Sequence, residues 1–118
     1  ASIRVITPPI SKPGATRFEV RVPGADSNPY LVLAAIISLG LRGIKRQLKI
    51  SHPPLAKGNK ADVDSHKLVQ LARSLKEANE RFMRQGSVAR KILGDKFVQH
   101  FGGTREHEIQ LWEQTVTD

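Results

Sequence analysis

The sequence contains no cysteine among its 118 residues. Disulfide bonds, cysteine-ligated zinc sites and thiol nucleophiles are therefore excluded. No run approaches the roughly eighteen consecutive apolar residues that a membrane span needs, so no membrane partner is expected. The chain also has no glycine-rich phosphate loop, no Ser-His-Asp set and no evident pair of catalytic carboxylates. Because a lack of cysteine suits a reducing compartment, a cytoplasmic location is expected.

Acidic residues are few as well. The 11 Asp and Glu residues are outnumbered by 19 Lys and Arg, which gives a formal net charge of +8. Such a balance favours anionic partners, including nucleotide phosphates, nucleic acid and acidic proteins. Hydrophobic residues make up 39% of the chain and charged residues 25%, which is typical of a globular protein. The length suits a single domain with its own core.

The N-terminal part of the chain is predicted to form a β-hairpin over residues 2–22. Its strands are Ser2–Ile6 and Thr16–Val22, and the segment between them is rich in proline. The pair Asn28-Pro29 then marks a helix start, because asparagine caps a helix and proline fits its first position. This helix is expected over residues 29–48, and its first half is apolar on all sides, which predicts burial.

The C-terminal part is predicted to be a surface loop at 50–64 followed by a helical region at 65–117. Ser74 has the spacing of a capping box and should begin one helix. Gly86-Ser87 should separate that helix from the next. Gly102-Gly103 is expected to end a helix before a last one begins. A hairpin followed by several packed helices makes the fold class α+β.

The most informative run is Arg17-Phe18-Glu19-Val20-Arg21. Side chains alternate between the two faces of a strand, so Arg17, Glu19 and Arg21 should share one face. Phe18, Val20 and the following valine should share the other face and point into a core. Guanidinium groups bind phosphate, and a carboxylate can hold Mg²⁺ together with phosphate oxygens. The charged face therefore has the chemistry of a phosphate and metal site.

A solvated strand face explains the same spacing, and on spacing alone it is the better interpretation. Alternating charges are ordinary on half-exposed sheets, and surface ion pairs contribute little. Arg4 lies on the neighbouring strand. If its face matches that of Arg17, three guanidinium groups converge.

The remaining polar clusters are predicted to be surface features. A basic stripe on the long helix could bind a nucleic-acid backbone, but a solvated helix face is the favoured interpretation and a nucleic-acid partner is not expected. Its members are Arg42, Lys45, Arg46 and Lys49. The histidines lack metal-ligand spacing, and Asp62 with Asp64 lacks the acidic pattern of a calcium loop. The histidines are His52, His66, His100 and His107.

Taken together, these segments resemble the C-terminal part of a glutamine synthetase catalytic domain. The strongest part of the resemblance is the Arg-x-Glu-x-Arg strand joined to Asn28-Pro29-Tyr30-Leu31. The resemblance covers nearly the whole chain and points to the branch that includes γ-glutamyl-amine ligases and fungal homologues. The resemblance to this branch lies in Gly94-Asp95-Lys96-Phe97-Val98-Gln99-His100-Phe101 with Thr104-Arg105-Glu106. The other matching segments are Ser2-Ile3-Arg4-Val5, Gly40-Leu41-Arg42-Gly43-Ile44-Lys45 and Ser74-Leu75-Lys76-Glu77-Ala78.

The resemblance implies an enzyme that uses ATP and Mg²⁺ or Mn²⁺ to join glutamate to ammonia or another amine. It implies that Glu19 is a metal ligand and that Arg17 contacts ATP phosphates. Arg4 would lie near the γ-phosphate, and Arg21 would hold the transferring phosphate or the substrate carboxylate. The implied catalytic residues are thus Arg21 and Arg4. Under this interpretation the hairpin belongs to the catalytic barrel, and the functional interpretation of the strand overtakes the solvated face.

The resemblance also implies that the other metal ligands and most of the nucleotide pocket lie upstream of residue 1. The 118 residues are accordingly expected to be a C-terminal fragment that is inactive alone, from a parent that forms a homo-oligomeric ring. An alternative of a different class stays open. The chain could be a non-catalytic binding module, either a degenerate homologue or a basic domain that binds an acidic partner or nucleic acid.

Overall fold

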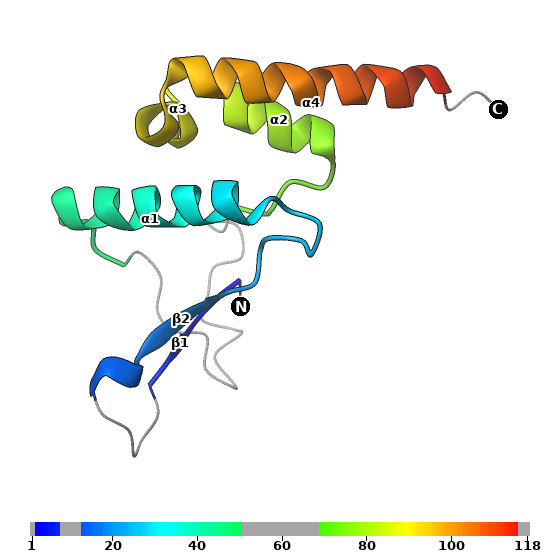
Figure 1. Ribbon diagram of the computed structural model, residues 1–118. Helices are drawn as coiled ribbons and strands as arrows, with labels where there is room; N and C mark the ends of the chain where they lie inside the picture. The colour runs from blue at the N-terminus through cyan, green and yellow to red at the C-terminus, as the bar shows by residue number, and fades with distance from the viewer. Residues whose placement is uncertain (1, 8–12, 51–68, 116–118) are drawn as a thin grey trace. The chain divides into compact units, whose positions relative to one another are not determined.

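The computed structural model describes residues 2–7, 13–50 and 69–115. Nearly all of the loop expected at 50–64 and the first residues of the helical region lie outside this part. The described chain divides into two compact units, and the division falls within the first helix, after Ala34. The described residues form one antiparallel hairpin, one short 3-10 turn and four helices, so the class is α+β (Figure 1). They are β1 (Ile3–Ile6), the 3-10 turn (Pro13–Ala15), β2 (Arg17–Val20), α1 (Pro29–Lys45), α2 (Leu75–Met83), α3 (Val88–Leu93) and α4 (Asp95–Thr115).

The hairpin forms as the alternating pattern predicts. β1 pairs with β2 in antiparallel register, with Arg4 opposite Glu19 and Ile6 opposite Arg17. β2 ends at Val20, two residues before the expected end. The pairing nevertheless extends past it, because the N–H of Arg21 donates to the carbonyl of Ser2 over 2.9 Å.

The apolar face of the hairpin is not a core, so this part of the prediction is wrong. Phe18 is 73% exposed, and Val5 and Val22 are also largely exposed. The alternation of apolar and polar residues correctly separates the two faces. However, a two-stranded sheet cannot bury either face without a covering layer.

Helix α1 begins where the sequence indicates. The side-chain oxygen of Asn28 accepts hydrogen bonds from the N–H groups of Tyr30 at 3.0 Å and Leu31 at 3.3 Å. These bonds satisfy two of the donors that a helix leaves free in its first turn. Pro29 occupies the first helical position, where its missing N–H costs nothing.

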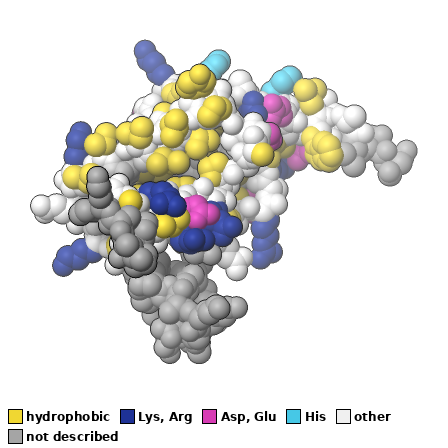
Figure 2. Space-filling model, turned by 60° about the horizontal axis from the view of Figure 1, so that its bottom comes forward, with side chains coloured by type: hydrophobic (Ala, Val, Ile, Leu, Met, Phe, Trp, Pro, Cys, Tyr) yellow, Lys and Arg dark blue, Asp and Glu magenta, His cyan; other side chains and the backbone are white. Residues whose placement is uncertain are grey.

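The far end and the burial of α1 differ from expectation. The helix ends at Lys45 rather than at residue 48, because Gln47 adopts a left-handed conformation with φ of 48°. The N–H of Leu48 then donates to the carbonyl of Gly43 over 3.0 Å, as in a Schellman motif. No residue of α1 is buried, and Tyr30 is 80% exposed. The predicted burial of its first half is wrong for the same reason as in the hairpin: apolarity on all sides does not supply a covering layer. Hydrophobic side chains accordingly spread over the surface seen in Figure 2.

Two serine caps organise the helical part. The Ser74 hydroxyl accepts from the N–H of Glu77 over 3.1 Å and begins α2. The Ser87 hydroxyl accepts from the N–H of Arg90 over 3.2 Å and begins α3. Gly86 precedes this second cap with φ of 71°, a conformation that glycine adopts without strain. Both helix starts are confirmed.

The small core of the described residues lies where α2, α3 and α4 meet. Val98 is fully buried there. The rings of Phe82 and Phe101 meet edge-on at 5.7 Å, and those of Phe97 and Phe101 stack at the same separation. These three phenylalanine rings form part of this core, whereas Phe18 of the hairpin is exposed.

The pair Gly102-Gly103 does not end a helix, contrary to the prediction. Helix α4 runs without interruption through both residues (Figure 1). Gly102 is buried against Met83, and a Cβ atom added to it would overlap the Met83 side chain. Its carbonyl accepts a hydrogen bond of 3.0 Å from the side-chain amide of Asn79, which is itself buried. The glycine therefore allows α2 to approach α4 closely. In the part of the chain that the structure describes, no helix has the length and apolar run needed to cross a bilayer.

Candidate functional site on the hairpin

The strand register places the predicted site residues on one face. Facing residues of an antiparallel pair have side chains on the same side of the sheet. Arg4 therefore shares a face with Glu19, and Arg17 lies on that face two residues earlier. Arg21 follows two residues after Glu19, where the hydrogen bond to Ser2 keeps the chain alongside β1. Arg4 thus lies on the same face as Arg17, which is the condition that the sequence analysis required.

Glu19 is held between two guanidinium groups. Its Oε2 lies 3.4 Å from a terminal nitrogen of Arg4, and its Oε1 lies 3.2 Å from Nε of Arg21. The Glu19 side chain is 36% exposed, and the two arginine side chains are about three-fifths exposed. Charge-assisted hydrogen bonds measure about 2.7–2.9 Å, so these contacts are loose ion pairs in water-accessible surroundings. Such pairs contribute about 0–1 kcal/mol each, and their partners can exchange at little cost.

Arg17 differs from the other two arginines. Its guanidinium donates a hydrogen bond of 3.5 Å to the carbonyl of Ala15, in the turn before β2. It makes no ion pair with Glu19, although both residues are described. The site thus contains two guanidinium groups paired with the carboxylate and a third that is not.

The face has the donor set of a phosphate and metal site. Three guanidinium groups against one carboxylate leave an excess of positive charge that suits a phosphate chain. The carboxylate is the kind of ligand that Mg²⁺ takes alongside phosphate oxygens. In the described ranges, however, no group of three or more His, Asp and Glu side chains could enclose a metal ion. The residues therefore fit one wall of such a site.

The other polar candidates remain isolated. His100 and His107 are exposed on α4 and belong to no metal-ligand cluster of described residues. Arg42 is half-buried, and the other members of the basic stripe are exposed. The remaining two histidines and the aspartate pair, His52, His66, Asp62 and Asp64, lie outside the described residues.

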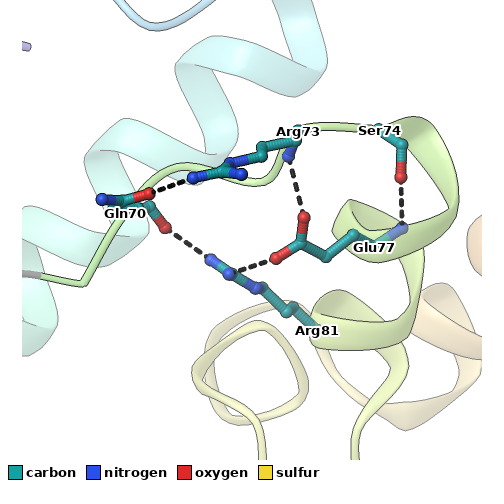
Figure 3. A network of polar contacts seen from close by, with 5 residues as sticks. All are labelled: Gln70, Arg73, Ser74, Glu77 and Arg81. Atoms are coloured by element: carbon teal, nitrogen blue, oxygen red, sulfur yellow. Dashed lines mark hydrogen bonds and ion pairs between the residues drawn. The ribbon is translucent and has the colours of Figure 1, made fainter.

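Sequence inspection missed a polar network before α2 (Figure 3). The guanidinium of Arg81 donates to the Gln70 carbonyl over 2.7 Å and also pairs with the Glu77 carboxylate. The N–H of Arg73 donates to the other Glu77 oxygen over 2.9 Å. This backbone hydrogen bond, followed by the charge of Arg81, lowers the pKa of Glu77 below its ordinary value of 4.5. The Glu77–Arg81 spacing of four residues was the available signal. The network fixes the entry to α2.

The comparison with protein families covers the complete chain. Residues 1–118 match the family described as glutamine synthetase, catalytic domain. The chain belongs to this family. The glutamine synthetase resemblance seen in the sequence is thereby confirmed.

The names of the curated relatives refer to different amines or amide products. A glutamate–isopropylamine ligase from Pseudomonas is 42% identical over 112 residues, which are 95% of this chain and 22% of that protein. Type-1 glutamine synthetase 2 from Dictyostelium discoideum is 38% identical over 107 residues, 84% of this chain and 20% of that protein. A γ-glutamylethanolamide synthetase from Streptomyces coelicolor is 33% identical over 102 residues, 86% of this chain and 21% of that protein.

This member of the glutamine synthetase family therefore spans about a fifth of the length of these relatives. No solved structure gave a significant match.

Proposed function

We propose that the chain is part of a ligase that uses ATP and Mg²⁺ to join glutamate to ammonia or another amine through a γ-glutamyl amide bond. The family assignment and the names of the relatives support this proposal. The observation that carries it is a single hairpin face on which Arg4 and Arg21 pair with the Glu19 carboxylate and Arg17 adds a third guanidinium group. That arrangement suits phosphoryl transfer, which depends on positioning and charge neutralisation.

Each residue of the face has a proposed role. Glu19 would be a ligand of Mg²⁺, or of Mn²⁺ in its place, and this ion would neutralise nucleotide phosphates. Arg17 and Arg4 would hold ATP phosphates. Arg21 would hold the transferring phosphate or the carboxylate of the substrate. Because a guanidinium stays charged at all working pH values and offers a planar fork of donors, it suits all three positions.

The proposal requires residues beyond this chain. One carboxylate cannot enclose a metal ion, so further ligands must come from another segment or another subunit. The hairpin would form part of the wall of the catalytic barrel, with the apolar face covered by the rest of the domain. We propose that the parent protein is cytoplasmic and homo-oligomeric, with a ring as the form expected from the resemblance, and that the 118-residue chain has no ligase activity alone.

The amine is open among several classes. The names of the relatives mention isopropylamine and a γ-glutamylethanolamide, and one of them is a glutamine synthetase. An assay should therefore offer ammonia, a branched alkylamine and an amino alcohol in parallel.

The test uses a longer protein that carries this segment. Formation of γ-glutamyl amide from glutamate, ATP and each amine is measured for the wild type, Glu19→Ala and the control Glu106→Ala. Glu106 is an exposed residue of α4, so its substitution removes one surface carboxylate that does not belong to the hairpin face. We expect Glu19→Ala to lose nearly all turnover and Glu106→Ala to keep it.

The same assay distinguishes the ligase from a binding module. A degenerate homologue or a basic binding domain would show no ATP-dependent product with any amine, in the wild type as in the variants. Product formation by the wild type together with full activity of Glu19→Ala would contradict the role of the carboxylate while leaving the ligase activity in place.

A further inference from the structure

The paired atoms on the hairpin face are the same atoms that its proposed ligands need. Both oxygens of Glu19 face guanidinium groups, one from Arg4 and one from Arg21. A metal ion at Glu19 needs those oxygens, and a phosphate chain needs those guanidinium groups. Neither ligand can therefore bind fully while the three residues remain paired with one another.

From this geometry we propose that Glu19 occupies the place of a phosphate group when no nucleotide is bound, and that phosphate and metal bind by exchange. This inference rests on the proposed function of the face and adds a coupling between its two ligands. An incoming phosphate chain takes the guanidinium groups of Arg4 and Arg21. The released Glu19 carboxylate then becomes available to the metal ion that accompanies the phosphate.

The energetics permit this exchange. The two ion pairs are long, at 3.4 and 3.2 Å, and they lie in exposed surroundings, so breaking them costs little. A metal ion arriving alone would add positive charge beside three arginines, which is unfavourable. A phosphate chain arriving alone would displace Glu19 from its arginines. The unpaired Glu19 carboxylate would then lie close to the negative charge of the phosphates and repel it. Each ligand removes the obstacle to the other, which is a positive coupling between their binding free energies.

Arg17 provides an internal contrast. It shares the face, but its guanidinium is not paired with Glu19 and instead contacts the Ala15 carbonyl. It can contribute to phosphate affinity without taking part in the exchange. Removal of Arg17 should therefore weaken phosphate binding and leave the coupling between phosphate and metal unchanged.

The test measures binding by calorimetry with the 118-residue chain and two probes, free inorganic tripolyphosphate and its complex with Mn²⁺. On a simply cationic surface the free anion binds more tightly, because it carries more negative charge than the complex. The exchange predicts the opposite order in the wild type. In Glu19→Gln the order should revert, and free tripolyphosphate should bind about two- to tenfold more tightly than to the wild type, since no internal carboxylate competes for the guanidinium groups.

Three control variants isolate the pairing from net charge. Asp26→Asn removes a negative charge from the turn after β2 and should leave both affinities within about twofold. Arg17→Gln should weaken both probes in parallel. In an Arg4→Gln, Arg21→Gln background, Glu19→Gln should no longer raise the affinity for free tripolyphosphate.

The exchange is overturned if free tripolyphosphate binds the wild type more tightly than its Mn²⁺ complex. It is also overturned if Glu19→Gln has an undiminished effect in the double-arginine background, or if the wild type binds neither probe. These outcomes are separate from turnover. A longer protein that forms γ-glutamyl amide without this coupling would retain the proposed function and refute only the exchange.

Discussion

The sharpest structural prediction concerns the glycine at the contact between α2 and α4. In Gly102→Ala the new Cβ atom would overlap Cγ and Sδ of Met83 and lie 3.2 Å from its Cε. Because Cγ is near the root of the methionine, rotation of the terminal methyl group cannot relieve the overlap. The helices must separate, and the 3.0 Å hydrogen bond from Asn79 to the Gly102 carbonyl lengthens with them.

The neighbouring glycine supplies a matched control. A Cβ atom at Gly103 would meet nothing within 4 Å. Replacing glycine by alanine inside a helix gains about 1 kcal/mol from helix propensity, and this gain applies to both positions. Overpacking costs about 1–3 kcal/mol, and it applies only to Gly102. Gly102→Ala should therefore be about 1–3 kcal/mol less stable than Gly103→Ala. The Gly103→Ala variant should in turn be more stable than the wild type.

The assay is urea unfolding followed by far-ultraviolet circular dichroism, with all variants compared at the same temperature. A second comparison introduces Met83→Ala, which removes the atoms that the new Cβ meets. Gly102→Ala should then cost less than in the wild-type background. Equal stability of the Gly102→Ala and Gly103→Ala variants would refute the reasoning, because it would mean that the close approach of the two helices is absent.

Three further predictions concern the same helical part and the end of α1. Asn79→Asp removes the amide that donates to the Gly102 carbonyl, and a urea titration should show a loss of at least about 1–3 kcal/mol. Glu77 has a lowered pKa, so the stability it contributes is complete above pH 4.5 and is lost as the pH falls below that value. Thermal melts at pH 3 and pH 7 should therefore differ less for Glu77→Gln than for the wild type. Gln47→Gly removes a side chain from a left-handed conformation, so the free energy of unfolding should rise by up to about 1 kcal/mol. Arg46→Gly, the neighbouring control, should lower it. If thermal melts show Arg46→Gly to be the more stable variant, the assignment of the helix end is contradicted.

The features that the sequence predicted correctly are those with local causes. Asn28 and Ser74 cap helices through bonds to residues two or three positions ahead, so the neighbouring sequence suffices to recognise them. The shared face of Arg17, Glu19 and Arg21 follows from strand geometry alone. Each of these inferences uses only a few consecutive residues.

The predictions that were wrong concern features that depend on contacts between distant segments. Gly102 was taken for a helix end because glycine lacks helix propensity, whereas its actual role is set by Met83, nineteen positions earlier in the chain. Phe18 and Tyr30 were expected in a core, but both are largely exposed among the described residues, because burial depends on covering segments that no local pattern can report.

The candidate site combines both kinds of information. The alternation of residues placed Glu19 beside its arginines, but only the strand register shows that Arg4 lies directly opposite. The proposed roles of these residues come from the resemblance to glutamine synthetase, since a row of alternating charges has the same appearance on an ordinary solvated strand.

The central claim is that Glu19 binds the metal ion of an ATP-dependent γ-glutamyl ligase. The most direct measurement is the Mg²⁺ concentration at which glutamate-dependent ATP turnover reaches half its maximum, in a longer protein carrying this segment. Loss of a hydrogen-bond partner of a metal ligand weakens metal binding about tenfold or more. Loss of the ligand itself should weaken it at least as much. The account predicts that Glu19→Gln raises the Mg²⁺ requirement by at least that factor. An unchanged Mg²⁺ requirement, with turnover still present, would contradict it.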